Sequence, residues 1–156
     1  MVHSNILHYK SGILRQLKKI FPIENFSEKD LQKLLRISQI RKYRTGQIII
    51  EQGNTDGFTY YLISGQVRIE KDGNLLLVLR RGGDVFGEMG AIDGFQRSAS
   101  VMALEDCVCL AINMKRLENL AEAESYAFKY MIYRNISREL SVKLRATTKA
   151  LVEARN

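Results

Sequence analysis

The sequence predicts a mainly β domain with flanking helices, built as an antiparallel sandwich or barrel. Between about residues 38 and 113, short β-branched or aromatic runs alternate with glycine turns, and no helical pattern separates one run from the next. Ten of the 11 glycines lie between Gly46 and Gly94, whereas no glycine or proline occurs from Met114 onward. We therefore divide the 156 residues into N-terminal helices at 1–37, a β region at 38–113 and C-terminal helices at 114–156.

The N-terminal zone is predicted to form helices. Apolar residues recur at helical spacing, and the only proline, Pro22, ends the run. These residues are Ile13, Leu14, Leu17 and Ile20. Ser27, followed by Glu28 and Asp30, is typical of an N-cap with an acidic first turn, so a further helix is expected from residue 28.

The β region contains a recognisable hairpin. Val67 and Ile69 alternate with charged residues, and the apolar run Leu75–Leu79 follows after Asp72-Gly73. An Asp-Gly pair between two such runs favours a two-residue hairpin turn. Shorter apolar runs at 48–50 and 60–63 precede it, so several short strands are expected before residue 80.

The C-terminal zone is predicted to hold a short helix around Leu117 and Leu120 and then a long amphipathic helix. Apolar positions and one threonine step along the long helix by three or four residues. They are Tyr133, Ile136, Leu140, Leu144, Thr147 and Leu151. The helix either packs on its own β region or forms a two-helix seam in a homodimer, and the near-heptad spacing favours the seam.

The chain is basic, with a formal net charge of +7. Residues 1–40 and 134–156 each contribute +4, whereas 41–113 contribute −1 and 114–133 contribute 0. We interpret this excess as two basic helical zones beside a near-neutral β region, not as a nucleic-acid groove. No apolar run approaches the roughly 20 residues of a membrane span. The N-terminus does not resemble a signal peptide, so a cytoplasmic protein without membrane contact is expected.

Cys107 and Cys109 lie in an alternating apolar stretch and would face the same side of one strand. That position is too close along the backbone for an ordinary disulfide. The chain has no second cysteine pair, and His3 and His8 are remote in sequence, so neither a metal site nor a haem or redox sensor is favoured. Both thiols are expected to be buried and reduced.

The segment Phe86–Val101 carries the residues expected of a phosphate-and-sugar site. It places a turn at Gly87, a carboxylate at Glu88, a short helical turn, and then Arg97 entering a strand. Helix N-termini attract anions, and the planar guanidinium matches phosphate oxygens. A carboxylate beside a phosphate is repulsive unless it accepts hydrogen bonds from hydroxyls, and a ribose supplies them. The alternative interpretation makes Arg97 an ordinary strand arginine and Glu88 a capping residue.

This segment resembles the phosphate-binding cassette of cyclic nucleotide-binding domains, as in bacterial catabolite activator proteins and protein kinase A regulatory subunits. The resemblance covers about residues 22–145 and continues upstream of the cassette through a set of matching positions. These are Gly46, Gly53, Asp56, Tyr61, Ile63, Gly65 and Val67. It implies an eight-stranded antiparallel jelly-roll barrel, with N-terminal helices and a long C-terminal helix.

The resemblance also implies roles for the cassette residues. Glu88 would hold the ribose 2′-hydroxyl and Arg97 the cyclic phosphate, while the amides of Gly90 and Ser98 would also meet the phosphate. Ile69 and Leu77 would line the base pocket. The full ligand-binding set is Gly87, Glu88, Met89, Gly90, Arg97, Ser98, Ala99, Ile69 and Leu77. The sequence departs from the family at Ala91, where a leucine usually couples the cassette to the C-terminal helices.

The function that the resemblance implies is a receptor and not an enzyme. No Ser–His, Cys–His or paired-carboxylate arrangement is present, and no cofactor is expected besides the ligand. The serine at Ser98 follows the catabolite-activator pattern and predicts cAMP. A cGMP-selective sensor is the alternative, because a hydroxyl at that position also suits a guanine amino group.

A DNA-associated transcriptional regulator is a further alternative. Catabolite activators continue from the long helix into a winged helix-turn-helix, whereas this sequence ends at Asn156 while still helical in pattern. We therefore expect a stand-alone receptor domain without specific DNA recognition. Its signal would pass through movement of the C-terminal helix to an effector protein in trans.

Overall fold

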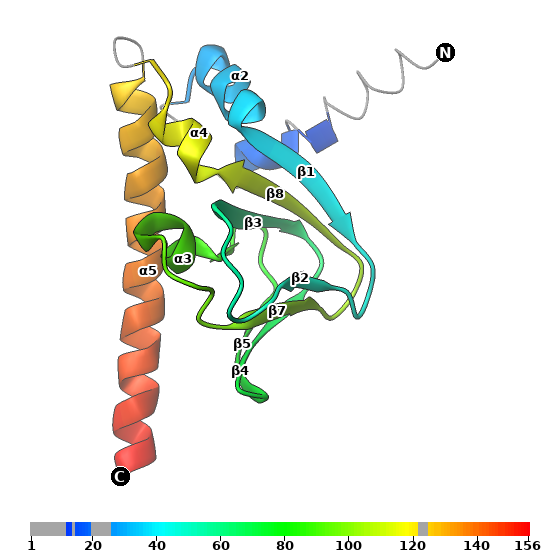
Figure 1. Ribbon diagram of the computed structural model, residues 1–156, viewed down its shortest axis with the longest axis vertical. Helices are drawn as coiled ribbons and strands as arrows, with labels where there is room; N and C mark the ends of the chain where they lie inside the picture. Colours follow the sequence, from blue (N-terminus) through cyan, green and yellow to red (C-terminus); the bar gives the residue numbers. More distant parts are fainter. Residues whose placement is uncertain (1–11, 14, 20–25, 122–124) are drawn as a thin grey trace. The chain divides into compact units, whose positions relative to one another are not determined.

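A computed structural model describes residues 12–13, 15–19, 26–121 and 125–156 of the chain (Figure 1). The chain divides into two compact units, the first ending at Leu117 and the second beginning at Glu118. The first unit contains every strand of the described residues, and the second contains the long C-terminal helix.

In the described residues, eight strands form two antiparallel sheets of four strands each, in the orders β1-β8-β3-β6 and β2-β7-β4-β5. The strands are β1 (Ser38–Tyr43), β2 (Ile48–Ile50), β3 (Phe58–Ser64), β4 (Val67–Lys71), β5 (Asn74–Leu79), β6 (Val85–Phe86), β7 (Ser100–Ala103) and β8 (Cys107–Asn113). β1 and β8 run side by side in Figure 1 over six paired residues. The prediction of a mainly β fold of antiparallel strands is confirmed, while closure into a barrel stays a prediction.

The helices are α2 (Glu28–Ile37), α3 (Glu88–Asp93), α4 (Met114–Glu118) and α5 (Tyr126–Arg155). Residues 12–13 and 15–19 are also helical, and the predicted positions Leu14, Ile20 and Pro22 lie outside the described residues. The predicted cap is confirmed, because the Ser27 hydroxyl accepts a hydrogen bond from the Asp30 N–H at 3.2 Å. The Asp30 carboxylate accepts one from the Ser27 N–H at 3.0 Å and completes a capping box.

The hydrophobic core contains buried residues from both sheets. Tyr60 on β3 stacks on Phe86 of β6, with ring centroids 5.2 Å apart, and Leu62, Val67 and Val101 belong to the same cluster. Burial of these apolar side chains is the main stabilising contribution expected for a domain of this size. The shared core therefore fixes the positions of the strand ends, including the end of β6 where the turn into α3 begins.

Cys107 and Cys109 are both buried and free, as the alternating pattern predicts. Burial raises the pKa of Cys109 to about 12 and also raises the pKa of Cys107. A raised thiol pKa keeps the sulfur protonated at neutral pH, and the thiolate is the reactive form. Both native thiols are therefore expected to be inert toward oxidation and alkylation in the folded protein.

The β4–β5 hairpin turns at Asp72-Gly73 as predicted. Asp72 has φ +51° and Gly73 has φ +78°, the two positive values that a type I′ turn requires. The tip is tied to the chain near β2, because Gln52 Nε2 donates a hydrogen bond to Asp72 Oδ1 at 2.8 Å. The Asp72 N–H in turn donates to Gln52 Oε1 at 3.1 Å.

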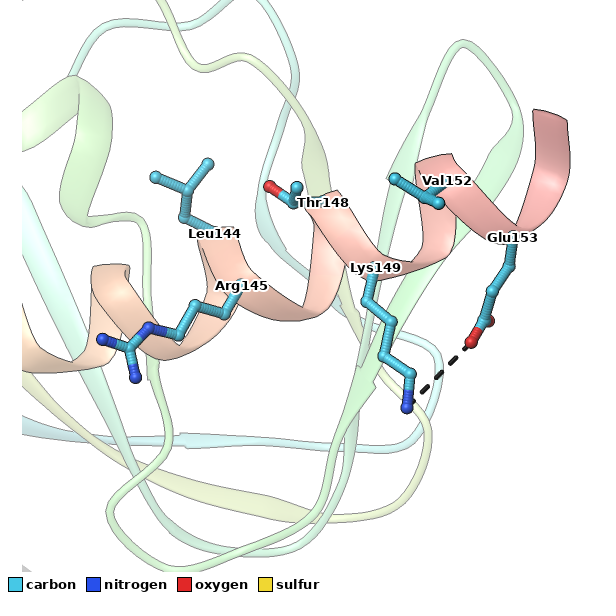
Figure 2. Close-up of a pocket in the computed structure, with 6 residues that line it drawn as sticks. All are labelled: Leu144, Arg145, Thr148, Lys149, Val152 and Glu153. Atoms are coloured by element: carbon cyan, nitrogen blue, oxygen red, sulfur yellow. Dashed lines mark ion pairs between the residues drawn. The ribbon is translucent and has the colours of Figure 1, made fainter. Parts of the chain in front are cut away.

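The second unit is dominated by α5, which spans 30 residues. Phe128, Ile132 and Ile136 are buried, whereas Leu144 is 68% exposed. Leu144, Thr148 and Val152 project from one side of the helix, and Arg145, Lys149 and Glu153 project from the adjacent side (Figure 2). Of the predicted stripe, Ile136 is buried, Tyr133 and Leu140 are half-buried, and the positions from Leu144 onward are exposed.

No described helix combines the length and the apolar character needed to cross a membrane.

Candidate ligand-binding site

The segment predicted to be the cassette begins at the turn between β6 and α3. Gly87 is the N-cap of α3 with φ +73°, and Gly94 ends the helix with φ +75°. A Cβ atom at Gly87 would lie 2.7 Å from Ile50 Cδ1 and 2.8 Å from Arg97 Nη1. Glycine is thus required here both by the backbone conformation and by the close approach of Arg97. The predicted glycine turn and short helix are present.

Arg97 is only 4% exposed, and each of its three guanidinium nitrogens donates a hydrogen bond within the protein. Its Nε donates to Asp56 Oδ2 at 3.1 Å, and its Nη2 donates to Asp56 Oδ1. The same Nη2 donates to the Phe58 carbonyl at 2.6 Å, and Nη1 donates to the Gly87 carbonyl. The arginine therefore joins the cassette turn to the start of β3 through a two-pronged ion pair.

Backbone hydrogen bonds hold the Arg97 segment against the loop that carries Asp56. The Arg97 N–H donates to the Asn54 carbonyl at 2.8 Å, and the Gly53 N–H donates to the Arg97 carbonyl at 2.9 Å. The Ser100 hydroxyl accepts from the Gln52 N–H at 2.9 Å. Hydrogen bonds thus join two segments that lie more than 40 residues apart in sequence, and both segments are next to the Arg97 guanidinium.

Sequence reasoning missed the part played by Asp56. The family pattern includes Asp56 without giving it a role, and its partner lies 41 residues away. Its carboxylate is 35% exposed while the guanidinium side chain is 3% exposed. The aspartate therefore supplies the counter-charge for a buried cation and also fixes which way that cation points. No periodicity or local spacing indicates such a long-range pair.

The other predicted cassette residues lie around this arginine with different exposures. Glu88, the first residue of α3, is 4% exposed, which is unusual for a glutamate. Met89 is 55% exposed, Ser98 is exposed, and Gly90 and Ala99 are half-buried. A Cβ at Gly90 would lie 3.4 Å from Arg97 Cδ, so the helix backbone passes close to the arginine.

The two predicted base-pocket residues are paired with each other in the second sheet. Ile69 on β4 lies opposite Leu77 on β5, and on its other side it lies opposite Val101 on β7. Val101 pairs with Ile50, whose Cδ1 atom is the one that crowds Gly87. Residues paired across neighbouring strands lie on the same face of a sheet. Ile50, Val101, Ile69 and Leu77 therefore form one apolar row, which begins beside Gly87 and ends at Leu77, a residue that is 39% exposed.

A substitution at Asp56 tests the ion pair directly. We expect Asp56→Asn to lower the free energy of unfolding by about 1–2 kcal/mol, because the buried guanidinium loses its counter-charge. The partial exposure of Asp56 keeps the effect at the low end of the range for buried pairs. Urea denaturation measures the change.

Glu51→Gln is the matched control, since Glu51 is an exposed carboxylate in the same loop. Its removal is expected to change stability by less than about 0.5 kcal/mol. Equal urea denaturation midpoints for Asp56→Asn and Glu51→Gln would show that the ion pair between Asp56 and Arg97 contributes nothing to stability.

Within the described residues, no group of three or more His, Cys, Asp or Glu side chains is placed to hold a metal ion. The cassette contains one buried arginine, one buried glutamate, and the backbone of a glycine-bounded helical turn.

Comparison with known proteins identifies the class of protein. The family model described as "Cyclic nucleotide-binding domain" matches residues 40–124, which include the whole cassette and both sheets except the first two residues of β1. The chain therefore belongs to the cyclic nucleotide-binding domain family. That membership confirms the resemblance drawn from the residues.

The relatives include proteins named for cGMP and proteins named for cAMP. The chain is 29% identical over 97 residues to a cGMP-dependent protein kinase of Toxoplasma gondii, covering 62% of this chain and 9% of the kinase. It is 26% identical over 104 residues to a cAMP-dependent protein kinase regulatory subunit of Debaryomyces hansenii, covering 67% of this chain and 23% of that protein. The chain thus spans less than a quarter of the length of these two relatives.

A solved structure is similar over most of the chain. The catabolite activator protein of Thermus thermophilus superposes with a TM-score of 0.68 at 27% identity. The match covers 85% of this chain and 62% of that one.

Proposed function

We propose that this chain is a receptor domain for cAMP that transmits its signal without catalysing a reaction. The observation that carries the proposal is the buried Arg97, which is held beside the glycine-bounded turn of a cyclic nucleotide-binding family member. A buried guanidinium with fixed direction suits one phosphodiester group. A site without an activated nucleophile or base suits binding and release of that group unchanged.

In this proposal Arg97 binds the cyclic phosphate and Glu88 accepts a hydrogen bond from the ribose 2′-hydroxyl. The backbone N–H groups of Gly90, Ser98 and Ala99 complete the phosphate site, and Met89 lies beside it. The two side chains come from opposite ends of the cassette and are both nearly buried. Their different charges match the phosphate and the sugar of one compact ligand.

To bind a phosphate, Arg97 must give up some of its present hydrogen bonds and donate to the phosphate oxygens instead. Its donors are directed at Asp56, the Phe58 carbonyl and the Gly87 carbonyl. The Gly87 bond is the one within the cassette, so we propose that the phosphate replaces this contact while Asp56 continues to hold the other side of the fork. Binding would then draw the turn between β6 and α3 into a new position. The ligand shifts this equilibrium only by its different affinity for the two positions.

The cassette movement is proposed to reach the C-terminal helices. Ala91 lies on α3, where the family usually has a leucine that performs this coupling, so this chain has a smaller side chain at that position. Ile92 follows directly and is 44% exposed, which makes it the larger apolar group available on that helix. The signal would pass to α5 and from there to an effector protein in trans.

A homodimer through α5 is part of the proposal. The exposed stretch of the helix carries apolar residues at Leu144, Leu151 and Val152, each more than half exposed. Helices with such a stripe commonly bury it against a second copy. Cytoplasmic location and the lack of specific DNA recognition complete the proposed function.

The base preference is proposed from Ser98 and from the apolar row that ends at Ile69 and Leu77. Relatives are named for cGMP as well as for cAMP, so base identity needs a direct measurement. Competition calorimetry with both nucleotides on the full chain is expected to give tighter binding of cAMP. A roughly tenfold higher affinity for cGMP, equal to about 1.4 kcal/mol of binding free energy, would contradict the proposed cAMP preference and identify cGMP as the ligand.

A further inference from the structure

The side chain of Arg41, on β1, contacts β3 although the two strands are not neighbours. In the first sheet β8 lies between them, so no backbone ladder joins β1 to β3. Arg41 Nη1 donates a hydrogen bond to the Tyr60 hydroxyl at 2.9 Å, and Arg41 Cζ lies 4.3 Å from the centroid of the Phe58 ring. The same Cζ lies 5.7 Å from the centroid of the Tyr60 ring. Arg41 therefore makes cation–π contacts with two aromatic rings of β3.

The other partners of the Arg41 guanidinium are neutral. Its Nε and Nη2 both donate to Gln39 Oε1, at 3.3 and 3.1 Å. Burial raises the pKa of Tyr60 well above its ordinary value, so the hydroxyl stays protonated and accepts from Arg41 as a neutral group. Among the ion pairs of the described residues, none joins Arg41 to a carboxylate. The cation is therefore held by one hydroxyl, one amide and two rings.

Phe58 begins β3 and holds the arginine of the ligand site through its backbone. Its N–H donates to Asp56 Oδ1 at 3.1 Å, and its carbonyl accepts a hydrogen bond from Arg97 Nη2 at 2.6 Å. Asp56 in turn accepts from Arg97 Nε at 3.1 Å. One residue therefore orients both groups on the Asp56 side of the guanidinium, and the ring of that same residue contacts Arg41.

Tyr60 leads to the other side of the same guanidinium. Its ring stacks on Phe86, with the two planes 4° apart and the centroids 5.2 Å apart, and the two residues are paired between β3 and β6. Phe86 directly precedes Gly87, whose carbonyl accepts a hydrogen bond from Arg97 Nη1. Tyr60 therefore connects Arg41 to the Gly87 side of the Arg97 fork.

We propose that Arg41 is a positioning residue for the ligand site, which fixes the Arg97 guanidinium through Phe58 and Tyr60. The inference rests on the proposed function, in which Arg97 binds the cyclic phosphate. A guanidinium binds phosphate through directed N–H groups, so a small turn of its plane weakens these hydrogen bonds. Arg41 lies on a strand outside the cassette, so it acts on affinity through the residues that it holds.

Arg41→Met tests the inference, because methionine keeps an unbranched apolar side chain and removes the cation with all its donors. We expect cAMP to bind about fivefold more weakly in calorimetry on the full chain. Arg41→Lys keeps a cation for Phe58 and a donor for Tyr60, so its affinity should return to within about twofold of the wild type. Circular dichroism checks that both variants are folded.

Arg44→Met is the matched control, since Arg44 is an exposed arginine directly after β1. Its affinity for cAMP should equal that of the wild type. The loss in Arg41→Met should also depend on Arg97. In an Arg97→Lys background the fork is already absent, so adding Arg41→Met should change affinity by less than about twofold.

A second measurement needs no ligand. The Arg97 Nε–H group donates to Asp56, so its NMR signal reports directly on the position of the guanidinium. We expect Arg41→Met to shift this signal and to speed its exchange with water, whereas Arg44→Met should leave both unchanged.

An unchanged Arg97 signal in Arg41→Met would overturn the inference. So would a fivefold loss of affinity that persists in the Arg97→Lys background, because Arg41 would then act independently of Arg97. Absence of cAMP binding in the wild type would instead contradict the proposed function. The ligand-free Arg97 signal would still decide whether Arg41 positions the guanidinium.

Discussion

Arg97→Ala is expected to weaken cAMP binding by at least about 100-fold, which corresponds to about 3 kcal/mol. In the proposed site this side chain supplies the charge-assisted hydrogen bonds to the phosphate, each of which contributes about 1.5–3 kcal/mol. The arginine is buried and directed by Asp56, so no neighbouring cation takes its place easily. Isothermal titration calorimetry on the full chain measures the loss.

Two further variants separate charge from geometry. Arg97→Lys keeps the charge but loses the planar fork, so its affinity should lie between those of the wild type and the alanine variant. Arg81→Ala removes an exposed arginine after β5 and should bind as the wild type does. Asp56 is 35% exposed, so in Arg97→Ala it is hydrated and the fold is retained, which circular dichroism checks. Wild-type affinity in Arg97→Ala would remove the arginine from the ligand site.

Gly87→Ala is expected to reduce both stability and binding. An alanine at φ +73° costs about 1–2 kcal/mol from the backbone conformation alone. Its Cβ would also lie 2.8 Å from Arg97 Nη1 and 2.7 Å from Ile50 Cδ1. The arginine must then move, so we expect a loss of about 2 kcal/mol or more in the free energy of unfolding. Affinity for cAMP should fall by about tenfold.

Gly94→Ala is the matched control for this substitution. Gly94 ends the same helix with φ +75°, but a Cβ there would meet no atom within 4 Å. Its loss of stability should therefore be limited to the backbone cost of about 1–2 kcal/mol, and its affinity should stay close to that of the wild type. Equal affinities in the two variants would show that crowding at Arg97 does not control the ligand site.

Local patterns in the sequence predicted the elements that local chemistry controls. Ser27 and Asp30 form the predicted capping box, and Asp72-Gly73 forms the predicted hairpin turn. The alternation around Cys107 and Cys109 predicted their burial. Each of these signals depends on residues only a few positions apart, so backbone geometry and side-chain chemistry are enough to interpret them.

The long-range parts of the site were not available from such patterns. Nothing near Arg97 in sequence indicates that Asp56 and the Phe58 carbonyl take its donors, because these groups meet only after the sheets have formed. The apolar stripe of α5 was predicted, but periodicity does not distinguish its buried part at Ile136 from its exposed part at Leu144. The same limit applies to β5, where a run of leucines indicates a strand without indicating that it lies at an edge.

The central claim is that this chain binds a cyclic nucleotide at the cassette. Calorimetric titration of the full chain with cAMP, and separately with 5′-AMP, tests it most directly. The two ligands share base and ribose but differ in the phosphate, which is a cyclic diester in one and an open monoester of higher charge in the other. We predict saturable one-to-one binding of cAMP and binding of 5′-AMP that is weaker by at least tenfold, or about 1.4 kcal/mol. No heat of binding with cAMP or cGMP, or equal affinity for cAMP and 5′-AMP, would contradict the account.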